Sequence, residues 1–291
     1  WVMGNELYAG LPVGSECQRA AKRLDPGRFF ADSDGIWAFD IADPLVKAIP
    51  PGWNINLLQP QNDRETLDLY FLQYLDPLTG NATYPRIEPK KPAIVHETGD
   101  YVTFSRPDLA DQFQHNIKPF WLTAGREKLK QLGLAEEAVA WAEASDRLYV
   151  QINKDNLEAL RSNPYLSGYH WWLFQDYWTT SNGLFDHYFR PKAITEEEIL
   201  RFNNDVVLLQ EGLASTYRGQ ERLEASLLVS NYSPEPLHGE LTWTVTVGDQ
   251  RLTQQSVSRE IPQGELVEAC SLDLVLPEVT APTLMKLAAA W

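Results

Sequence analysis

The sequence predicts an α/β region up to about residue 203, followed by an all-β region at residues 204–291. In the first region, short apolar runs alternate with helix-like stretches, a pattern typical of parallel βαβ units. In the second, apolar runs follow one another at short spacing between turn-forming residues, which is typical of antiparallel sheets. A third observation concerns chemistry: two carboxylates, Glu6 and Glu97, stand at the carboxyl ends of predicted strands of the first region.

The elements of the α/β region follow from the periodicity of its apolar residues. Residues 163–164, Asn-Pro, end the last predicted helix of this region. The segment 109–145 is longer than a simple crossover, and we expect a helical lid there. Strands are predicted at 1–3, 28–31, 54–58, 92–95 and 168–174, and helices at 15–24, 66–74, 126–144 and 146–161.

The all-β region predicts a β-sandwich of the immunoglobulin type. Turn-forming residues at 231–234, 248–249 and 262–264 separate its apolar runs. The predicted strands are 223–229, 240–247, 254–258, 266–276 and 284–288.

Composition excludes several classes of function. The 291 residues carry a net charge of -15, which repels phosphate backbones and argues against nucleic acid as a partner. No uninterrupted apolar run approaches the roughly 20 residues of a membrane helix. Cys17 and Cys270 fit neither a metal site nor a disulfide framework.

The two glutamates lie at the carboxyl ends of predicted strands, where a (β/α)8 barrel places its catalytic groups. Glu6 and Glu97 are about 90 residues apart, and a barrel uses roughly 31 residues for each βα unit. Three units therefore separate the two strands, which would let the carboxylates face each other across the mouth of the barrel. A solvated loop position is the alternative for either glutamate taken alone.

Several motifs in order give the chain a resemblance to glycoside hydrolase family 2, the β-galactosidase, β-glucuronidase and β-mannosidase group. Gly4-Asn5-Glu6 resembles the acid/base motif of strand four, and residues 91–99 (KPAIVHETG) resemble the nucleophile segment of strand seven. The other matches are residues 23–28 before strand five, residues 166–172 with Asp176 at strand eight, and residues 183–192 at the exit from the barrel. The resemblance implies an incomplete (β/α)8 TIM barrel, strands four to eight, in residues 1–203.

The resemblance also implies a role for individual residues. Glu6 would be the general acid/base and Glu97 the nucleophile, while Asn5 would bind the sugar 2-hydroxyl and Trp172 would form an apolar wall under the ring. Further substrate contacts are expected from His96, Asp176 and Trp121, and His96 stands where many members have Ser or Cys; His170 is expected in the core. Trp121 could equally be a core-packing residue.

The resemblance implies retaining exo-hydrolysis of a β-linked sugar, a reaction that requires no organic cofactor and no metal. One carboxyl group protonates the leaving oxygen and the other traps the sugar carbon covalently. β-Galactosidase activity is the first expectation, because it is the commonest activity in the family that the chain resembles. β-Glucuronidase activity is less expected, since we find no convincing Asn-x-Lys pair of the kind that binds a uronate carboxylate. The alternative is a carbohydrate-binding protein, derived from such an enzyme, that has lost turnover. A binding protein has no reason to keep both Glu6 and Glu97 on matched strand ends.

The beginning of the sequence leads to a further expectation. The chain starts at Trp1 and shows no signal segment, so its localisation cannot be read from it. Because only five residues precede Glu6, we expect strands one to three and preceding sandwich domains of the same protein to complete the barrel. Taken alone, residues 1–291 are expected to be inactive and poorly soluble. An oligomer is compatible with the sequence.

Overall fold

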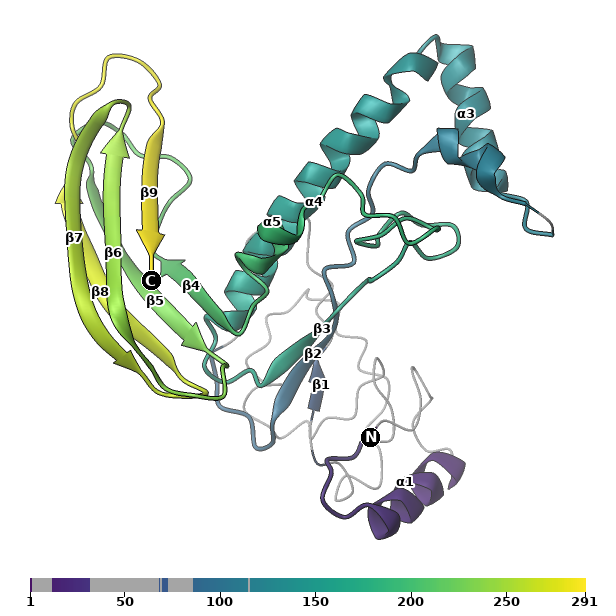
Figure 1. Cartoon of the computed structure of the whole chain (residues 1–291), viewed down its shortest axis with the longest axis horizontal. Helices are drawn as coiled ribbons and strands as arrows, with labels where there is room; N and C mark the ends of the chain where they lie inside the picture. The colour runs from purple at the N-terminus through teal and green to yellow at the C-terminus, as the bar shows by residue number, and fades with distance from the viewer. Residues whose placement is uncertain (2–11, 32–67, 69, 73–85, 115) are drawn as a thin grey trace. The chain divides into compact units, whose positions relative to one another are not determined.

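The computed structural model describes the chain except for residues 2–11, 32–67, 69, 73–85 and 115 (Figure 1). The described residues form a mixed α/β structure with many strands in sheets and few helices. They divide into two compact units, Trp1–Ile199 and Leu200–Trp291. The predicted strand 54–58 lies outside the described residues.

The first unit contains a parallel sheet of strands β1 (Tyr70–Leu72), β2 (Ala93–Thr98) and β3 (Gly168–Trp171), in that order (Figure 1). The predicted strands at 92–95 and 168–174 are therefore present, the second ending three residues early. Ala93 and Val95 are fully buried, as expected for a central strand of a parallel sheet. The half-barrel remains a prediction for this region.

The predicted helix at 66–74 is wrong where the structure describes it, because residues 70–72 form β1. Tyr70 pairs with Ala93 and Leu72 with Val95, in parallel register. The apolar residues of this segment fit a helical period, but Tyr70 and Phe71 also favour a strand. Pairing with β2, which is distant in the sequence, decides between the two.

A long helical connection joins β2 to β3. It comprises the 3₁₀ turn η2 (Pro107–Gln112), α3 (Phe120–Leu132), a second 3₁₀ turn η3 (Ala135–Glu137) and α4 (Ala138–Arg161). The predicted helix boundary at residue 145 is wrong, since α4 runs through it. The helical segment is interrupted instead at Gly133, directly after α3. Gly133 has φ 70°, and its amide donates to Lys130 O, as is common for a glycine that follows a helix.

Two shorter helices lie near the beginning and the end of this unit in the sequence. α1 (Pro12–Leu24) confirms the predicted helix at 15–24 and ends with Lys22 and Arg23, whose charges suit a helix carboxyl terminus. α5 (Glu196–Leu200) begins with a capping box in which Glu198 N donates to Thr195 Oγ1 and Thr195 N donates to Glu198 Oε2. None of the helices in the described ranges has the length and apolar content needed to cross a bilayer.

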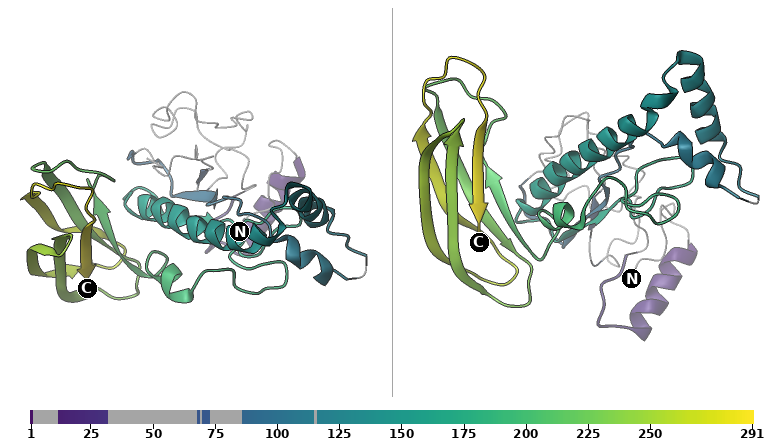
Figure 2. Two further views of the ribbon diagram at one scale, coloured as in Figure 1. Left: turned by 90° about the horizontal axis from the view of Figure 1, so that it is seen from above. Right: turned by 45° about the horizontal axis from the view of Figure 1, so that its top comes forward.

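The second unit consists of two three-stranded antiparallel sheets (Figures 1 and 2). One has the order β4-β5-β8 and the other β7-β6-β9. The predicted strands of this region are all present, and β4 is an addition that the sequence pattern did not predict. Their bounds are β4 Val206–Glu211, β5 Arg222–Asn231, β6 Leu237–Val247, β7 Gln250–Ile261, β8 Leu266–Val275 and β9 Met285–Ala290.

One apolar core lies between the two sheets. Alternate residues of β6, including Leu241, Trp243 and Val245, are buried against Leu223 and Val229 of β5. This alternation is what a sheet with one face against a core requires. The immunoglobulin type of the sandwich is a finer classification that stays a prediction.

Candidate functional site

The described part of the candidate site lies at β2 and β3 and in the segments that follow them. Glu6 and Asn5, the predicted acid/base and its neighbour, lie outside the described residues. Glu97, Trp172, His96, Asp176 and Trp121 lie within them. The structure therefore gives the surroundings of the predicted nucleophile.

Glu97 is the penultimate residue of β2, at the point where the regular strand geometry is interrupted. Its φ is 51°, and the pairing of β2 with β3 shifts register between Val95 and Thr98. Such an irregularity re-aims a side chain that a regular strand would point elsewhere. The Glu97 side chain keeps 17% of its surface exposed, so its carboxylate is sheltered but within reach of solvent.

Gly99 makes this turn possible. It has φ +81°, a conformation that residues with a Cβ rarely adopt. A Cβ there would lie 2.1 Å from Asn153 Oδ1 of α4 and 2.8 Å from Trp171 Cδ1 of β3. The backbone that follows Glu97 is thus held closely against both α4 and β3.

His96 is buried next to Glu97. Its Nε2 lies 3.2 Å from Glu97 Oε1, and its Nδ1 lies 3.4 Å from His170 Nδ1. His170 is exposed, so the expectation that it is a core histidine is wrong: it occupies a position of β3 whose side chain is not covered. A contact of His96 with sugar remains a prediction, whereas its contact with Glu97 is a feature of the structure.

Trp172 follows β3 directly and is attached to the Glu97 segment. Its amide donates to Thr98 O at 2.8 Å, and its ring centroid lies 6.2 Å from that of Tyr177. The ring is half-buried, and the Trp172–Leu173 peptide bond is cis. The structure therefore brings Trp172 and Glu97 to the same end of the sheet, and the role of Trp172 as a sugar wall stays a prediction.

Asp176 is almost fully buried, and its carboxylate binds protein groups. Lys192 Nζ lies 2.5 Å from Oδ1, which also accepts a hydrogen bond from Gly183 N. Ser181 Oγ donates to Oδ2 at 3.0 Å, and His187 Nδ1 lies 3.7 Å from the same oxygen. These contacts order the segment after β3, and the predicted sugar contact of Asp176 remains untested.

Trp121 lies in the first turn of α3 and belongs to a cluster of aromatic side chains. Its ring packs edge-on against Phe113 and Phe120, and it lies 5.9 Å from the His187 ring. The ring is half-buried, and within the described part of the chain its Nε1 has no hydrogen-bond partner. The structure thus supports a packing role for Trp121, and contact with substrate stays a prediction.

The sequence patterns missed a buried polar stripe on α4. Asp146, Tyr149, Asn153 and Asn156 are spaced at helical intervals and all are buried. Burial raises the pKa of Asp146, the Asp176 carboxylate raises it further, and Lys192 opposes the shift. The spacing of these four polar residues was a visible signal, but polar residues on one helical face ordinarily indicate a solvated surface.

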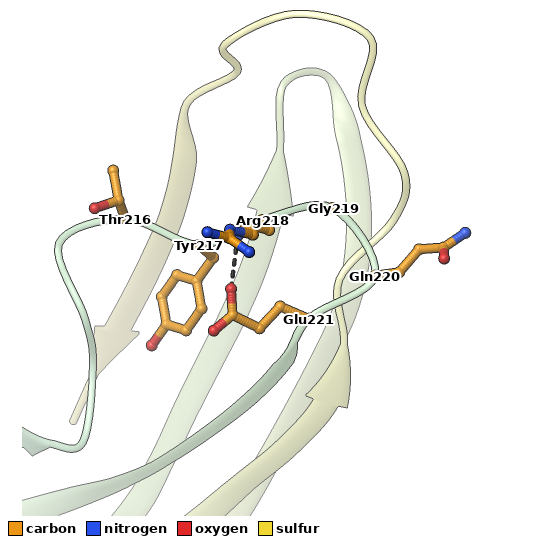
Figure 3. A pocket seen from close by; sticks show the side chains of 6 residues that line it. All are labelled: Thr216, Tyr217, Arg218, Gly219, Gln220 and Glu221. Carbon is orange, nitrogen blue, oxygen red and sulfur yellow. Dashed lines mark hydrogen bonds between the residues drawn. The ribbon is translucent and has the colours of Figure 1, made fainter.

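Other features of the described residues do not form a second chemical site. No group of three or more His, Cys, Asp or Glu side chains in the described ranges could hold a metal ion. An open concavity of about 650 Å³ lies in the second unit along Thr216–Glu221 (Figure 3). It is lined by one loop, whose Glu221 carboxylate accepts a hydrogen bond from Arg218 N.

Comparison with known proteins gives one family match and several structural likenesses. The family described as "Domain of unknown function (DUF8488)" matches residues 221–291. No curated protein matches the chain significantly.

The structural likenesses are partial. The exo-chitosanase CsxA of Amycolatopsis orientalis, in a complex with PNP-beta-D-glucosamine, is 17% identical, with a TM-score of 0.36 over 53% of this chain and 18% of that chain. A crystal structure of the same exo-chitosanase is 16% identical to this chain, with a TM-score of 0.37 over 58% of this chain and 20% of that chain. The chain thus spans about a fifth of the length of these structures. At these values, the likeness does not establish a shared fold.

Proposed function

We propose that the protein is a retaining exo-glycoside hydrolase that acts on a β-linked sugar. The observation that carries the proposal is the position of Glu97. It is a sheltered carboxylate at the carboxyl end of a strand in a parallel sheet, and Trp172 lies at the end of the neighbouring strand. Carboxylates at such strand ends are the groups that (β/α)8 hydrolases use.

The proposed reaction has two displacements. Glu97 attacks the anomeric carbon and forms a glycosyl ester while Glu6 donates a proton to the leaving oxygen. Glu6 then removes a proton from water, which attacks the same carbon and releases the sugar. For this class, we expect the two carboxyl groups to lie about 5–5.5 Å apart. The half-barrel, the immunoglobulin-like sandwich and the β-galactosidase-like specificity belong to the same proposal.

The test is a panel of nitrophenyl β-glycosides, including galactoside, glucosaminide, mannoside and glucuronide, with the full-length protein. The expected result is turnover of one β-glycoside with a β-configured first product. A protein that binds these sugars and turns none of them over would instead be the non-catalytic carbohydrate-binding protein.

Substitutions separate the roles of the two glutamates. Glu97→Gly should lower kcat by about 10³-fold or more, and azide should restore turnover as a glycosyl azide of inverted configuration. Glu6→Ala should spare the first step for substrates with good leaving groups, because these need no proton. The reverse pattern would mean that the two roles are exchanged.

A further inference from the structure

Several hydrogen bonds join the segment that carries Glu97 to the segment after β3. Trp172 N donates to Thr98 O, and Asn182 Nδ2 donates to Asp100 Oδ1 at 2.7 Å. Both Thr103 N and Thr103 Oγ1 donate to Ser181 O, at 2.7 and 2.6 Å. These bonds run from the position next to Glu97 to the start of the helical connection.

Lys192 lies at the far end of this series and joins both segments. Its side chain is only 5% exposed, and its ammonium group contacts Asp176 Oδ1 of one segment and Thr103 Oγ1 of the other. A buried ammonium group is strongly disfavoured unless it is paired and hydrogen-bonded. Lys192 is therefore held in place only while Asp176 and Thr103 are both in position.

The polar stripe on α4 and the neighbouring Ser145 bind the same two segments. Asn156 Nδ2 donates to Thr98 Oγ1 at 2.7 Å, and Ser145 Oγ accepts a hydrogen bond from Phe104 N. Tyr149 OH donates to Asn182 O, and Asp146 Oδ2 accepts from Ala193 N beside Lys192. One helix thus binds the Glu97 segment, the segment after β3 and the neighbour of Lys192.

We propose that Lys192 is a positioning residue, which fixes the backbone that carries Glu97 through its joint contact with Asp176 and Thr103 and does not itself touch the sugar. The catalytic consequence rests on the proposed function, whereas the effect on the backbone does not. Because catalysis depends on close alignment of the reacting atoms, a shift of about 1 Å in such a segment can cost on the order of 10²-fold in rate.

The experiment compares Lys192→Met with Lys192→Arg and with the matched control Arg190→Met in the full-length protein. Arg190 lies in the same segment and pairs with a carboxylate, Asp186, but its side chain is 48% exposed. Amide hydrogen exchange at residues 99–105 and 181–184 gives a readout that needs no activity. Steady-state kinetics on the best nitrophenyl glycoside gives kcat and KM separately.

For Lys192→Met, we expect exchange of the Thr103 and Gly183 amides to become at least about 10-fold faster. We also expect kcat to fall by about 10²-fold while KM stays within about threefold. Lys192→Arg, which keeps the charge, should recover part of both effects, and Arg190→Met should resemble the wild type. Unchanged exchange, or a loss confined to KM, would overturn the proposal.

Two further controls keep the outcomes distinct. If Lys192→Met does not fold, Thr103→Val tests the same junction, because it replaces the hydroxyl group that contacts Lys192, Ser181 and the Asp146 carboxylate. Faster exchange of the amide at position 103 supports the proposal, and unchanged exchange overturns it. If the wild-type protein turns over no glycoside, the proposed function fails, and the exchange measurement alone still decides the role of Lys192.

Discussion

Lys192 Nζ lies 2.5 Å from Asp176 Oδ1, and the two side chains are 5% and 2% exposed. Asp176 lies in the segment directly after β3, and Lys192 lies near the end of the same segment, four residues before α5 begins at Glu196. A buried pair of this kind is weak evidence for stability by itself, but loss of one partner leaves the other charge buried without compensation. The pair therefore holds the loop that contains Trp172 in one arrangement.

Replacing Asp176 by Asn should be strongly destabilising. The substitution removes the carboxylate that contacts the buried Lys192 ammonium group, and breaking a buried pair in this way typically costs about 3–5 kcal/mol. Urea unfolding of the full-length protein measures the loss. Asp273→Asn is a matched control, since Asp273 pairs with Arg222 on an exposed surface and its loss should have a much smaller effect. Equal effects of the two substitutions would contradict the role given to burial.

Gly99→Ala should disturb the turn that follows Glu97. The new Cβ would overlap with Asn153 Oδ1 and approach Trp171, and the positive φ adds strain of about 1–3 kcal/mol. We expect a lower melting temperature together with a lower kcat, because the strain falls beside Glu97. Gly168→Ala serves as the control in the same sheet, since a Cβ there meets no atom within 4 Å. A Gly99→Ala protein with wild-type stability would contradict this description of the turn.

Trp172→Ala separates sugar binding from packing. If the half-buried ring lines the sugar site, kcat/KM should fall by about 10–100-fold while the melting temperature changes by only a few degrees. A ring that serves the core would instead cost about 3–5 kcal/mol of stability. A melting curve recorded beside the kinetic assay distinguishes the outcomes. Trp178→Ala, at a position 62% exposed, should leave stability unchanged.

Asp146→Asn should change the dependence of stability on pH. Burial raises the pKa of Asp146 in the folded protein, so the folded state disfavours its ionised form. The stability contribution of Asp146 is then fully present below its unfolded pKa of about 3.9 and is lost as pH rises through the folded pKa. Relative to the wild type, Asp146→Asn should therefore gain stability from pH 4 to pH 7. A difference in unfolding free energy that is constant across this range would contradict the expectation.

Local patterns in the sequence were enough to predict β2 and β3 and the strands of the second unit other than β4. The predicted turn at 231–234 begins at Asn231, the last residue of β5, and continues between β5 and β6, and residues 262–264 lie between β7 and β8. The side chains and backbone preferences of these residues favour turns whatever surrounds them. For the same reason, Glu97 could be placed at the end of a strand from the apolar run before it. Each of these features depends on residues that are close in sequence.

The features that the sequence did not reveal depend on residues brought together from far apart. Residues 70–72 became a strand because β2 offers a pairing edge, against a local pattern that also fitted a helix. The polar face of α4 is buried because the segments at the ends of β2 and β3 supply hydrogen-bond partners for it. The spacing of polar residues within the helix does not predict these partners. Lys192 meets Thr103 across 89 positions of the chain. The sequence by itself thus determined the local elements and the position of Glu97 along the chain, and only the tertiary structure decided what holds Glu97 in place, since the contacts responsible exist only after distant segments have packed together.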